Sequence, residues 1–259
     1  MPTISVITPV YEGGHRHLGE AYRSLVEQPL PEGWSWQWIV QEDGRSGKPA
    51  SCLPADPRIS AGSGRRGGAA IARTMALARA TGTLIRALDA DDLLPVGTLA
   101  RDIETLQANP ELGWCVSPCL DLLPDGTLVP GPYDPPPGPL PQGLLAEGFA
   151  AGKLPVMGTT LTAHADLVRA VGGWPALPAY EDVALLLACE AVAAGWMNAE
   201  AGEIYRKHPR QSTKFSAYRD PDEIAARTAS ILARTETLRR SRWQWAPSRM
   251  SVQAECCKC

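Results

Sequence analysis

Three carboxylates stand within four residues, at Asp89, Asp91 and Asp92. They directly follow the mostly apolar run 83–88, which is typical of a buried strand. Carboxylates held this close repel one another, so a turn that keeps them ionised needs a compensating cation. Mg²⁺ and Mn²⁺ suit this role, because they prefer oxygen ligands and commonly bridge carboxylates to phosphates. The simpler interpretation is structural, with Asp91 or Asp92 capping the helix that follows.

Other polar side chains also lie at the ends of predicted strands. Asp43 closes a polar turn after the strand at 36–40, and Arg73 lies on a helix at 68–80 that precedes the acidic cluster. In open α/β sheets, ligands bind at the carboxyl ends of the strands, so these side chains are expected to converge on one rim. Three more residues are at the end of the first strand and belong to the same rim: Thr8, Pro9 and Tyr11.

Strands and helices alternate along the part of the chain that must position these residues. This order is typical of an α/β fold with a mostly parallel sheet between helices. The pattern predicts strands at 4–10, 36–40, 58–61 and 83–88, and helices at 17–27 and 68–80. Further on it predicts helices at 96–108, 180–194 and 222–245, strand segments within 113–122 and 159–171, a hairpin turn at Asp125-Gly126, and a proline-rich rim loop at 130–141.

Several of these segments occur in an order that resembles the family 2 glycosyltransferases, which have the GT-A fold. The resemblance covers roughly residues 3–213, and the run from Gly68 to Asp92 is its most specific part. It implies inverting, metal-dependent transfer of a sugar from a nucleotide-diphosphate donor, UDP-sugars favoured, to an acceptor hydroxyl or other nucleophile. The segments are ISVITPVYEGG, IVQEDGRS, GGAAIARTMALARATGTLIRALDADD, GGW and YEDVALLLACEAVAAGW.

The resemblance also implies roles for individual residues. Glu181-Asp182 would supply the catalytic base, usually the second of the pair, and Asp89 with Asp91 would form a D-x-D motif for ribose and metal-bound pyrophosphate. His208, in a segment similar to the family's C-terminal flap, would complete the shell of a bound Mn²⁺ or Mg²⁺. The nucleotide-binding residues would be Thr8, Pro9, Tyr11, Asp43, Arg73 and Asp89.

Two other functions compete with this one. Gly62–Gly67 reads GSGRRG, a literal GxGxxG ahead of a helix, with Asp89 at about the spacing that a dinucleotide site shows. An NAD(P)-dependent oxidoreductase using this loop is therefore one alternative, although the preceding strand is short and a flexible loop explains the glycines equally well. The other alternative is a catalytically silent module that binds sugar nucleotides.

Charge separates the C-terminal part from the rest of the chain. Residues 206–249 hold 11 Lys/Arg against 4 Asp/Glu, and residues 1–205 hold 13 against 23. We expect a glycosyltransferase domain at 1–215, a basic amphipathic helix at 216–249 and a cysteine-containing tail at 250–259. The helix could lie on an anionic membrane or pack on the domain or a second subunit. Its weakly hydrophobic stripe favours packing. A basic face of this kind is commonly exposed to solvent, so we expect no nucleic-acid partner.

Composition limits the classes of protein to which this chain could belong. The chain has 259 residues, a net charge of -3 and 44% hydrophobic residues, values typical of a globular protein. No apolar run reaches the roughly 18 residues of a membrane span, and the first apolar run has no basic segment before it. Seven cysteines, an odd number, suit free thiols. We expect a cytoplasmic protein, whose acceptor, whether small molecule, glycan or lipid-linked, has no recognisable sequence code.

Overall fold

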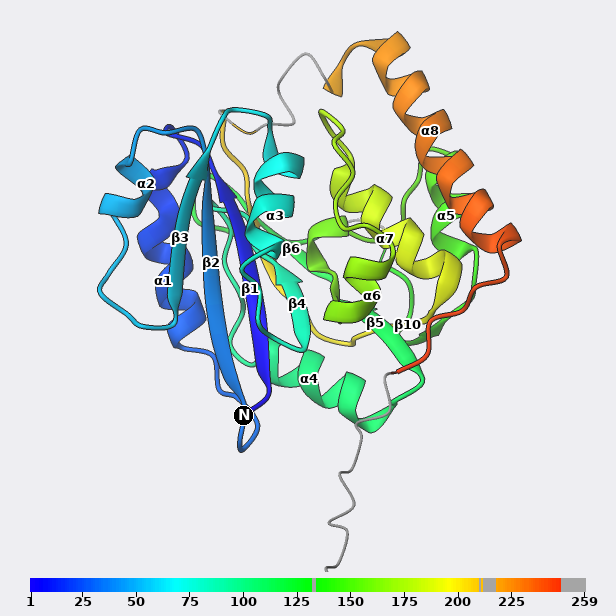
Figure 1. The fold of residues 1–259 in the computed structure, drawn as a ribbon, viewed down its shortest axis with the longest axis horizontal. Helices are drawn as coiled ribbons and strands as arrows, with labels where there is room; N and C mark the ends of the chain where they lie inside the picture. Colours follow the sequence, from blue (N-terminus) through cyan, green and yellow to red (C-terminus); the bar gives the residue numbers. More distant parts are fainter. Residues whose placement is uncertain (132–133, 210, 212–217, 248–259) are drawn as a thin grey trace, which may run out of the picture.

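The computed structural model describes residues 1–131, 134–209, 211 and 218–247. Its centre is an eight-stranded sheet (Figure 1). The strands lie in the order β3 (Ile59–Gly64), β2 (Ser35–Asp43), β1 (Thr3–Val10), β4 (Leu84–Ala87), β9 (Thr162–His164), β5 (Leu112–Val116), β10 (Ala194–Met197) and β8 (Gly138–Leu140). The first four in this order are parallel, as their alternation with helices predicts.

Helices cover both faces of this sheet (Figure 1). On one face, α1 (Leu18–Val26) and α4 (Thr98–Ala108) bury Leu25 and Ile103 against Val6 of β1. On the other face, α3 (Ala69–Leu77), α6 (Ala165–Ala170) and α7 (Glu181–Val192) pack around Ile7 and Ile85. Side chains of β1 alternate between two apolar layers. This burial on both faces explains why the strand is a nearly continuous β-branched run.

The antiparallel strand β9 enters the middle of the sheet, between β4 and β5. It separates the first parallel strands from β10, which is parallel to β5. Helix α7, which precedes β10 in the chain, is buried from Val183 to Val192, because its sequence is apolar on nearly every side. Beside it lie α5 (Leu144–Ala150) and the 3-10 turn Gly158–Thr160. The short helices at the N-terminal edge are the 3-10 turn His15–His17 and α2 (Lys48–Ser51).

A smaller sheet joins β11 (Glu203–Arg206), β6 (Cys119–Leu122) and β7 (Leu128–Pro130). The hairpin predicted at Asp125-Gly126 connects β6 to β7, and Gly126 has a φ of 87°, where glycine carries no steric penalty. Strand β8 lies within the proline-rich segment and pairs only with β10, as expected for a strand with few backbone donors. Strand β11 brings the segment after Glu203 next to Asp92, whose Oδ1 accepts from the Arg206 amide at 2.8 Å.

The C-terminal helix α8 (Pro221–Arg240) packs on α7 and α5 (Figure 1). Asp220 caps its N-terminus by accepting from the amides of Asp222 and Glu223, and Ile231 is buried in the core beneath it. The prediction that this helix reaches Trp245 is wrong, since α8 ends at Arg240 and Arg242 adopts a φ of 57°. The left-handed turn redirects the chain, and the Trp245 amide donates to the carbonyl of Val192 at 2.8 Å.

Trp245 fastens this C-terminal segment to the sheet. Its ring lies 4.9 Å from that of His164, and its indole Nε1 donates to Asp166 Oδ1 at 3.1 Å. Burial lowers the pKa of His164 below its ordinary value, and the negative charge of Asp166 only partly opposes this. The packing of Trp245 therefore favours the neutral form of the imidazole.

Acid should weaken this contact. The unfolded chain takes up a proton on His164 more readily than the folded chain, so the contribution to stability is complete above about pH 6.5 and is lost as the pH falls. A His164→Phe variant keeps a ring against Trp245 but cannot be protonated. Below about pH 6.5 its Tm should fall less steeply than that of the wild type. Parallel Tm curves for the two proteins would contradict the role given to His164.

Candidate active site

A pocket of about 260 Å³ opens where the carboxyl ends of β1, β2 and β4 meet the N-termini of α3 and α7. Thr159, in the 3-10 turn Gly158–Thr160, and Tyr218, which precedes α8, also line it. Eight of the ten residues predicted from the sequence line it: Pro9, Tyr11, Asp43, Arg73, Asp89, Asp91, Glu181 and Asp182. The convergence of strand ends on one rim, expected from the α/β pattern, therefore describes this pocket.

Arg73 organises the interior of the pocket. Its guanidinium is 2% exposed and donates to Asp89 Oδ1 at 2.5 Å and to Glu181 Oε1. Burial alone would lower the pKa of Arg73, but the negative charges of Asp89, Glu181 and Asp182 raise it above its ordinary value. Arg73 is therefore a permanent cation between two carboxylates that come from β4 and α7.

The two carboxylates remain costly to ionise despite this partner. Burial raises the pKa of Asp89, and it also raises that of Glu181, while Arg73 lowers both. The charge of Asp182 raises both pKa values further. A group of acids this close together depends on the cation beside it.

Asp182 occupies the open side of this acidic group. It lies in the first turn of α7, where the helix dipole favours a carboxylate, and Gly158 lies directly behind it. A Cβ atom on Gly158 would come within 2.8 Å of Asp182 Oδ2, so the glycine provides the space that this side chain fills. The preceding residue, Tyr180, has a φ of 64°, an unusual backbone conformation next to the predicted catalytic pair Glu181-Asp182.

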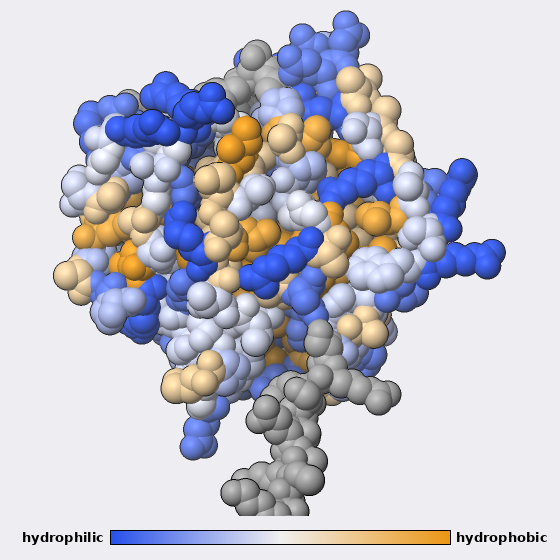
Figure 2. Space-filling model, in the orientation of Figure 1, coloured by the Kyte–Doolittle hydropathy of each residue, from blue (hydrophilic) through white to orange (hydrophobic). Residues whose placement is uncertain are grey.

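Pro9, Tyr11 and Asp43, which the sequence predicts to bind a nucleotide, line the pocket together. Asp43 Oδ1 accepts from the amides of Gly67 and Gly68 at 2.6 and 3.1 Å, which ties the glycine-rich loop to the end of β2. Figure 2 shows a strongly hydrophilic patch over these loops, where Arg45, Lys48, Arg65 and Arg66 are exposed.

Thr8 is not placed where the sequence predicted. It does not line the pocket; it is fully buried, and its hydroxyl accepts from the indole of Trp38 at 2.8 Å. Alternation along β1 explains the difference, because Thr8 shares a face with Val6 and Val10 and so points toward the α1 layer.

Asp91 and His208 meet in an adjoining cavity of about 390 Å³. His208 Nε2 lies 2.7 Å from Asp91 Oδ2, and Arg206 binds the Asp91 carbonyl at 2.9 Å and Glu20 at 2.7 Å. Within the described part of the chain, no group of three or more histidine, cysteine or acidic side chains is arranged around a metal position. Asp89, the third predicted ligand, is bound to Arg73. One carboxylate and one imidazole fit Mn²⁺ or Mg²⁺ where phosphate oxygens supply further ligands.

Two polar side chains of the pocket wall were not predicted from the sequence. Thr159 lines it from the 3-10 turn Gly158–Thr160, and Tyr218 lines it from the segment just before α8. Burial raises the pKa of Tyr218, and the charges of Asp182, Glu181 and Asp89 add to this, so its phenol stays protonated. Its ring meets that of Tyr180 edge-on at 5.5 Å. No local pattern marks either residue, because both reach the pocket through tertiary packing.

The glycine-rich segment Gly62–Gly67, on which the oxidoreductase alternative rests, has a structural role. Gly62 and Gly64 belong to β3 and pair with Gln41 and Asp43 of β2, so the first half of GxGxxG is part of an edge strand. The amides of Gly67 and Gly68 are already bound by Asp43. The cysteine-containing tail predicted at 250–259 lies outside the described residues.

The same strands and helices contain the part of the chain that matches a known family. Residues 5–120 match the sequence model of the family described as glycosyl transferase family 2. This part of the chain is similar to glycosyl transferase family 2. It runs from β1 into β6 and includes the family 2 candidates Asp43, Arg73, Asp89 and Asp91, whereas Glu181, Asp182 and His208 lie beyond the matched segment.

Solved structures show the same fold for nearly the whole chain. The crystal structure of TarS 1-349 from S. aureus in complex with UDP-GlcNAc has a TM-score of 0.66 at 17% identity, covering 94% of this chain and 74% of that one. Its complex with UDP has a TM-score of 0.62 at 18% identity, covering 93% and 72%. The predicted GT-A-like α/β fold with a C-terminal helix is confirmed. A search of curated proteins found no match.

None of the helices in residues 1–131, 134–209, 211 and 218–247 combines the length and the apolar character needed to cross a membrane.

Proposed function

We propose that this protein is an inverting glycosyltransferase that takes a sugar from a nucleotide-diphosphate donor, most favourably a UDP-sugar. The observation that carries the proposal is the ion-paired group of Arg73, Asp89 and Glu181, which lies beside Asp182 in a pocket built largely by the family 2 segment. Two similar folds, at 17% and 18% identity, are those of TarS in complex with UDP-GlcNAc and with UDP. They support the same class of donor.

Asp182 is the proposed general base. An acceptor hydroxyl beside it would lose its proton to the carboxylate while its oxygen forms a bond to the anomeric carbon. The bond from that carbon to the phosphate oxygen breaks on the opposite side, and the diphosphate leaves with the electron pair. Attack opposite the leaving group inverts the anomeric centre. Glu181 is less suited to this role, because its carboxylate is bound to Arg73.

The other pocket residues would orient the donor. Tyr11, 42% exposed at the rim, offers a ring beside the nucleotide, and Asp43 offers the carboxylate that would bind its base. Arg73 keeps the side chain of Asp89 in place at the end of β4, where it would bind ribose. These assignments agree with the position of each residue on the pocket wall.

Asp91 and His208 would hold a divalent ion, Mn²⁺ or Mg²⁺, together with the donor's phosphates. Such an ion, when bound, neutralises the charge that develops on the leaving diphosphate. The two side chains already face the same cavity, and Arg206 holds the Asp91 backbone from behind. This chain's own contribution is therefore to place one carboxylate and one imidazole next to the pocket.

A thermal-shift titration tests the proposal and its rivals. UDP with Mn²⁺ should raise the Tm, EDTA should abolish the shift, and NAD should leave the Tm unchanged, because ligands stabilise only the state that binds them. Hydrolysis of a panel of UDP-sugars then distinguishes an enzyme from a silent binding module. A shift with NAD and none with UDP would favour the oxidoreductase, and binding without turnover of any sugar donor would favour the silent module.

Asp91→Asn should remove the dependence of UDP binding on the ion. Asp121→Asn is the matched control, because Asp121 also pairs with a basic residue of the same segment, Lys207 at 2.9 Å, but lies outside both cavities. It should keep the wild-type response to Mn²⁺. If UDP stabilises the wild type equally well in EDTA, the metal assignment is wrong.

A further inference from the structure

Thr159 is the residue that follows Gly158, the glycine against which the Asp182 carboxylate packs. The missing side chain of this glycine leaves room for the Asp182 carboxylate, and Thr159 lines the same pocket with only 6% of its surface exposed. The Thr159 side chain and Asp182 therefore belong to the wall of one pocket.

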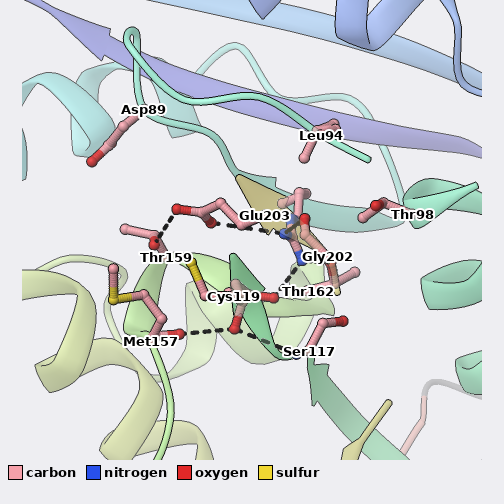
Figure 3. A network of polar contacts seen from close by, with 12 residues as sticks. Asp89, Leu94, Thr98, Ser117, Cys119, Met157, Thr159, Thr162, Gly202 and Glu203 are labelled. Carbon is pink, nitrogen blue, oxygen red and sulfur yellow. Dashed lines mark hydrogen bonds and ion pairs between the residues drawn. The ribbon is translucent and has the colours of Figure 1, made fainter. Parts of the chain in front are cut away.

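The proton of the Thr159 hydroxyl is already used. Oγ1 donates to Glu203 Oε1 at 2.7 Å, and Figure 3 shows the two side chains pointing toward each other. A hydroxyl has one proton and two lone pairs. With its proton directed toward Glu203, Thr159 can only accept hydrogen bonds from a ligand in the pocket.

A buried network keeps Glu203 from turning away. Glu203 is fully buried, and its Oε2 lies 3.9 Å from Nη2 of Arg86, which is also fully buried. Arg86 in turn donates to the Gly202 carbonyl at 2.7 Å and to Asp102 Oδ2 at 3.1 Å. Thr162 and Asn198 donate to Asp102 at 2.6 and 2.9 Å. These contacts hold the Arg86 guanidinium in place beside Glu203 Oε2, and the attraction between the two charges favours the orientation in which Oε1 faces Thr159.

We propose that Thr159 is a specificity-determining residue, whose hydroxyl oxygen accepts a hydrogen bond from a sugar hydroxyl bound next to Asp182. The inference rests on the proposed glycosyltransferase function and adds the chemical group that is recognised. That hydroxyl belongs either to the donor sugar or to a sugar acceptor. An ether or a deoxy position at the same place would leave the oxygen of Thr159 without a donor, and the pocket would select against it.

Three variants separate the contribution of the Thr159 hydroxyl from that of the rest of the side chain. Thr159→Val removes the hydroxyl at constant shape, Thr159→Ser retains it, and Thr160→Val is the matched control. Thr160 is fully buried in the same turn and donates to the Met157 carbonyl at 2.8 Å, but it does not line the pocket. With UDP-GlcNAc as probe, Thr159→Val should lose about tenfold in kcat/KM for hydrolysis or transfer. Thr159→Ser should restore most of it, and Thr160→Val should stay near the wild type.

Deoxy analogues distinguish recognition from a structural effect. With UDP-GlcNAc analogues that each lack one ring hydroxyl, the wild type and Thr159→Val should become alike for the analogue that lacks the recognised group. A loss in hydrolysis as well as transfer places that hydroxyl on the donor. The recognised hydroxyl belongs to the acceptor if Thr159→Val loses transfer activity but keeps its hydrolysis activity. In that case the wild type and Thr159→Val should also transfer to one deoxy acceptor at the same rate.

Two results separate failure of this inference from failure of the proposed function. If the wild type turns over UDP-GlcNAc and Thr159→Val has the same relative rates as wild type across all analogues, the Thr159 assignment is overturned and the enzyme class stands. If the wild type binds and hydrolyses no sugar nucleotide of the panel, the function itself is rejected. The assays belong at about pH 8, since burial raises the pKa of Glu203 to about 7, although Arg86 and Thr159 lower it.

Discussion

Asp182→Asn should lower turnover by about 10² to 10⁴-fold and leave UDP binding nearly unchanged. Asparagine has the shape of aspartate and can still sit in the first turn of α7 against Gly158, but it cannot accept the acceptor's proton. The expected result is therefore a fall in kcat with little change in the thermal shift produced by UDP. Steady-state rates and UDP titrations on the same protein preparation measure both quantities.

Asp222→Asn is the control for this experiment. Asp222 also lies in the first turn of a helix, α8, but it is exposed and lies outside the pocket. It should keep wild-type turnover. Wild-type turnover in Asp182→Asn itself would place the base on another residue, and Glu181 would be the first to examine.

Arg73→Met should lower the free energy of unfolding by about 3–5 kcal/mol. Methionine fills much of the same volume, but Asp89 and Glu181 then lose the cation that both contact inside the protein. Uncompensated buried charge is among the few single changes with so large an effect. Urea unfolding at neutral pH measures the change, and UDP binding should weaken with it because Asp89 is no longer held.

The pH dependence of stability tests whether lost charge pairing destabilises Arg73→Met. In the variant, both carboxylates lose the interaction that lowers their pKa values, so their protonated forms become more favoured in the fold. The stability gap to the wild type should therefore narrow as the pH falls. Arg66→Met, with the arginine side chain 74% exposed beside Glu12, should change stability by at most about 0.5 kcal/mol. A gap that stays constant with pH would mean that lost packing, not charge, destabilises the variant.

Local patterns accounted for most of the scaffold. The apolar run at 4–10, the breaker residues after it and the alanine-rich helix before Asp89 predict β1, β4 and α3 to within a few residues. The acidic residues follow strands in the sequence, and parallel strands align their carboxyl ends, so the rim with Asp43, Asp89 and Asp91 could be expected without coordinates. The turn at Gly126 follows from the backbone freedom of glycine alone.

Pairings between distant segments could not be predicted in this way. The insertion of β9 between β4 and β5 joins segments about 80 and 50 residues apart, which no local periodicity encodes. The end of α8 was misplaced for a related reason. The helical pattern continues past Arg240, but the burial of Trp245 against His164 favours a turn at Arg242.

The residue types that could do chemistry, and the end of the sheet at which they gather, follow from the amino-acid sequence, because the succession of elements along the chain and the residues at strand ends are local properties. The contacts that each of these groups makes depend instead on the tertiary structure. It placed Thr8 in the core, paired Arg73 with both Asp89 and Glu181, and directed the Thr159 hydroxyl toward Glu203. These contacts join residues from 16 to 108 positions apart. Their partners are chosen by the requirement that every buried polar group find a hydrogen bond or an opposite charge, which is a condition on the whole fold.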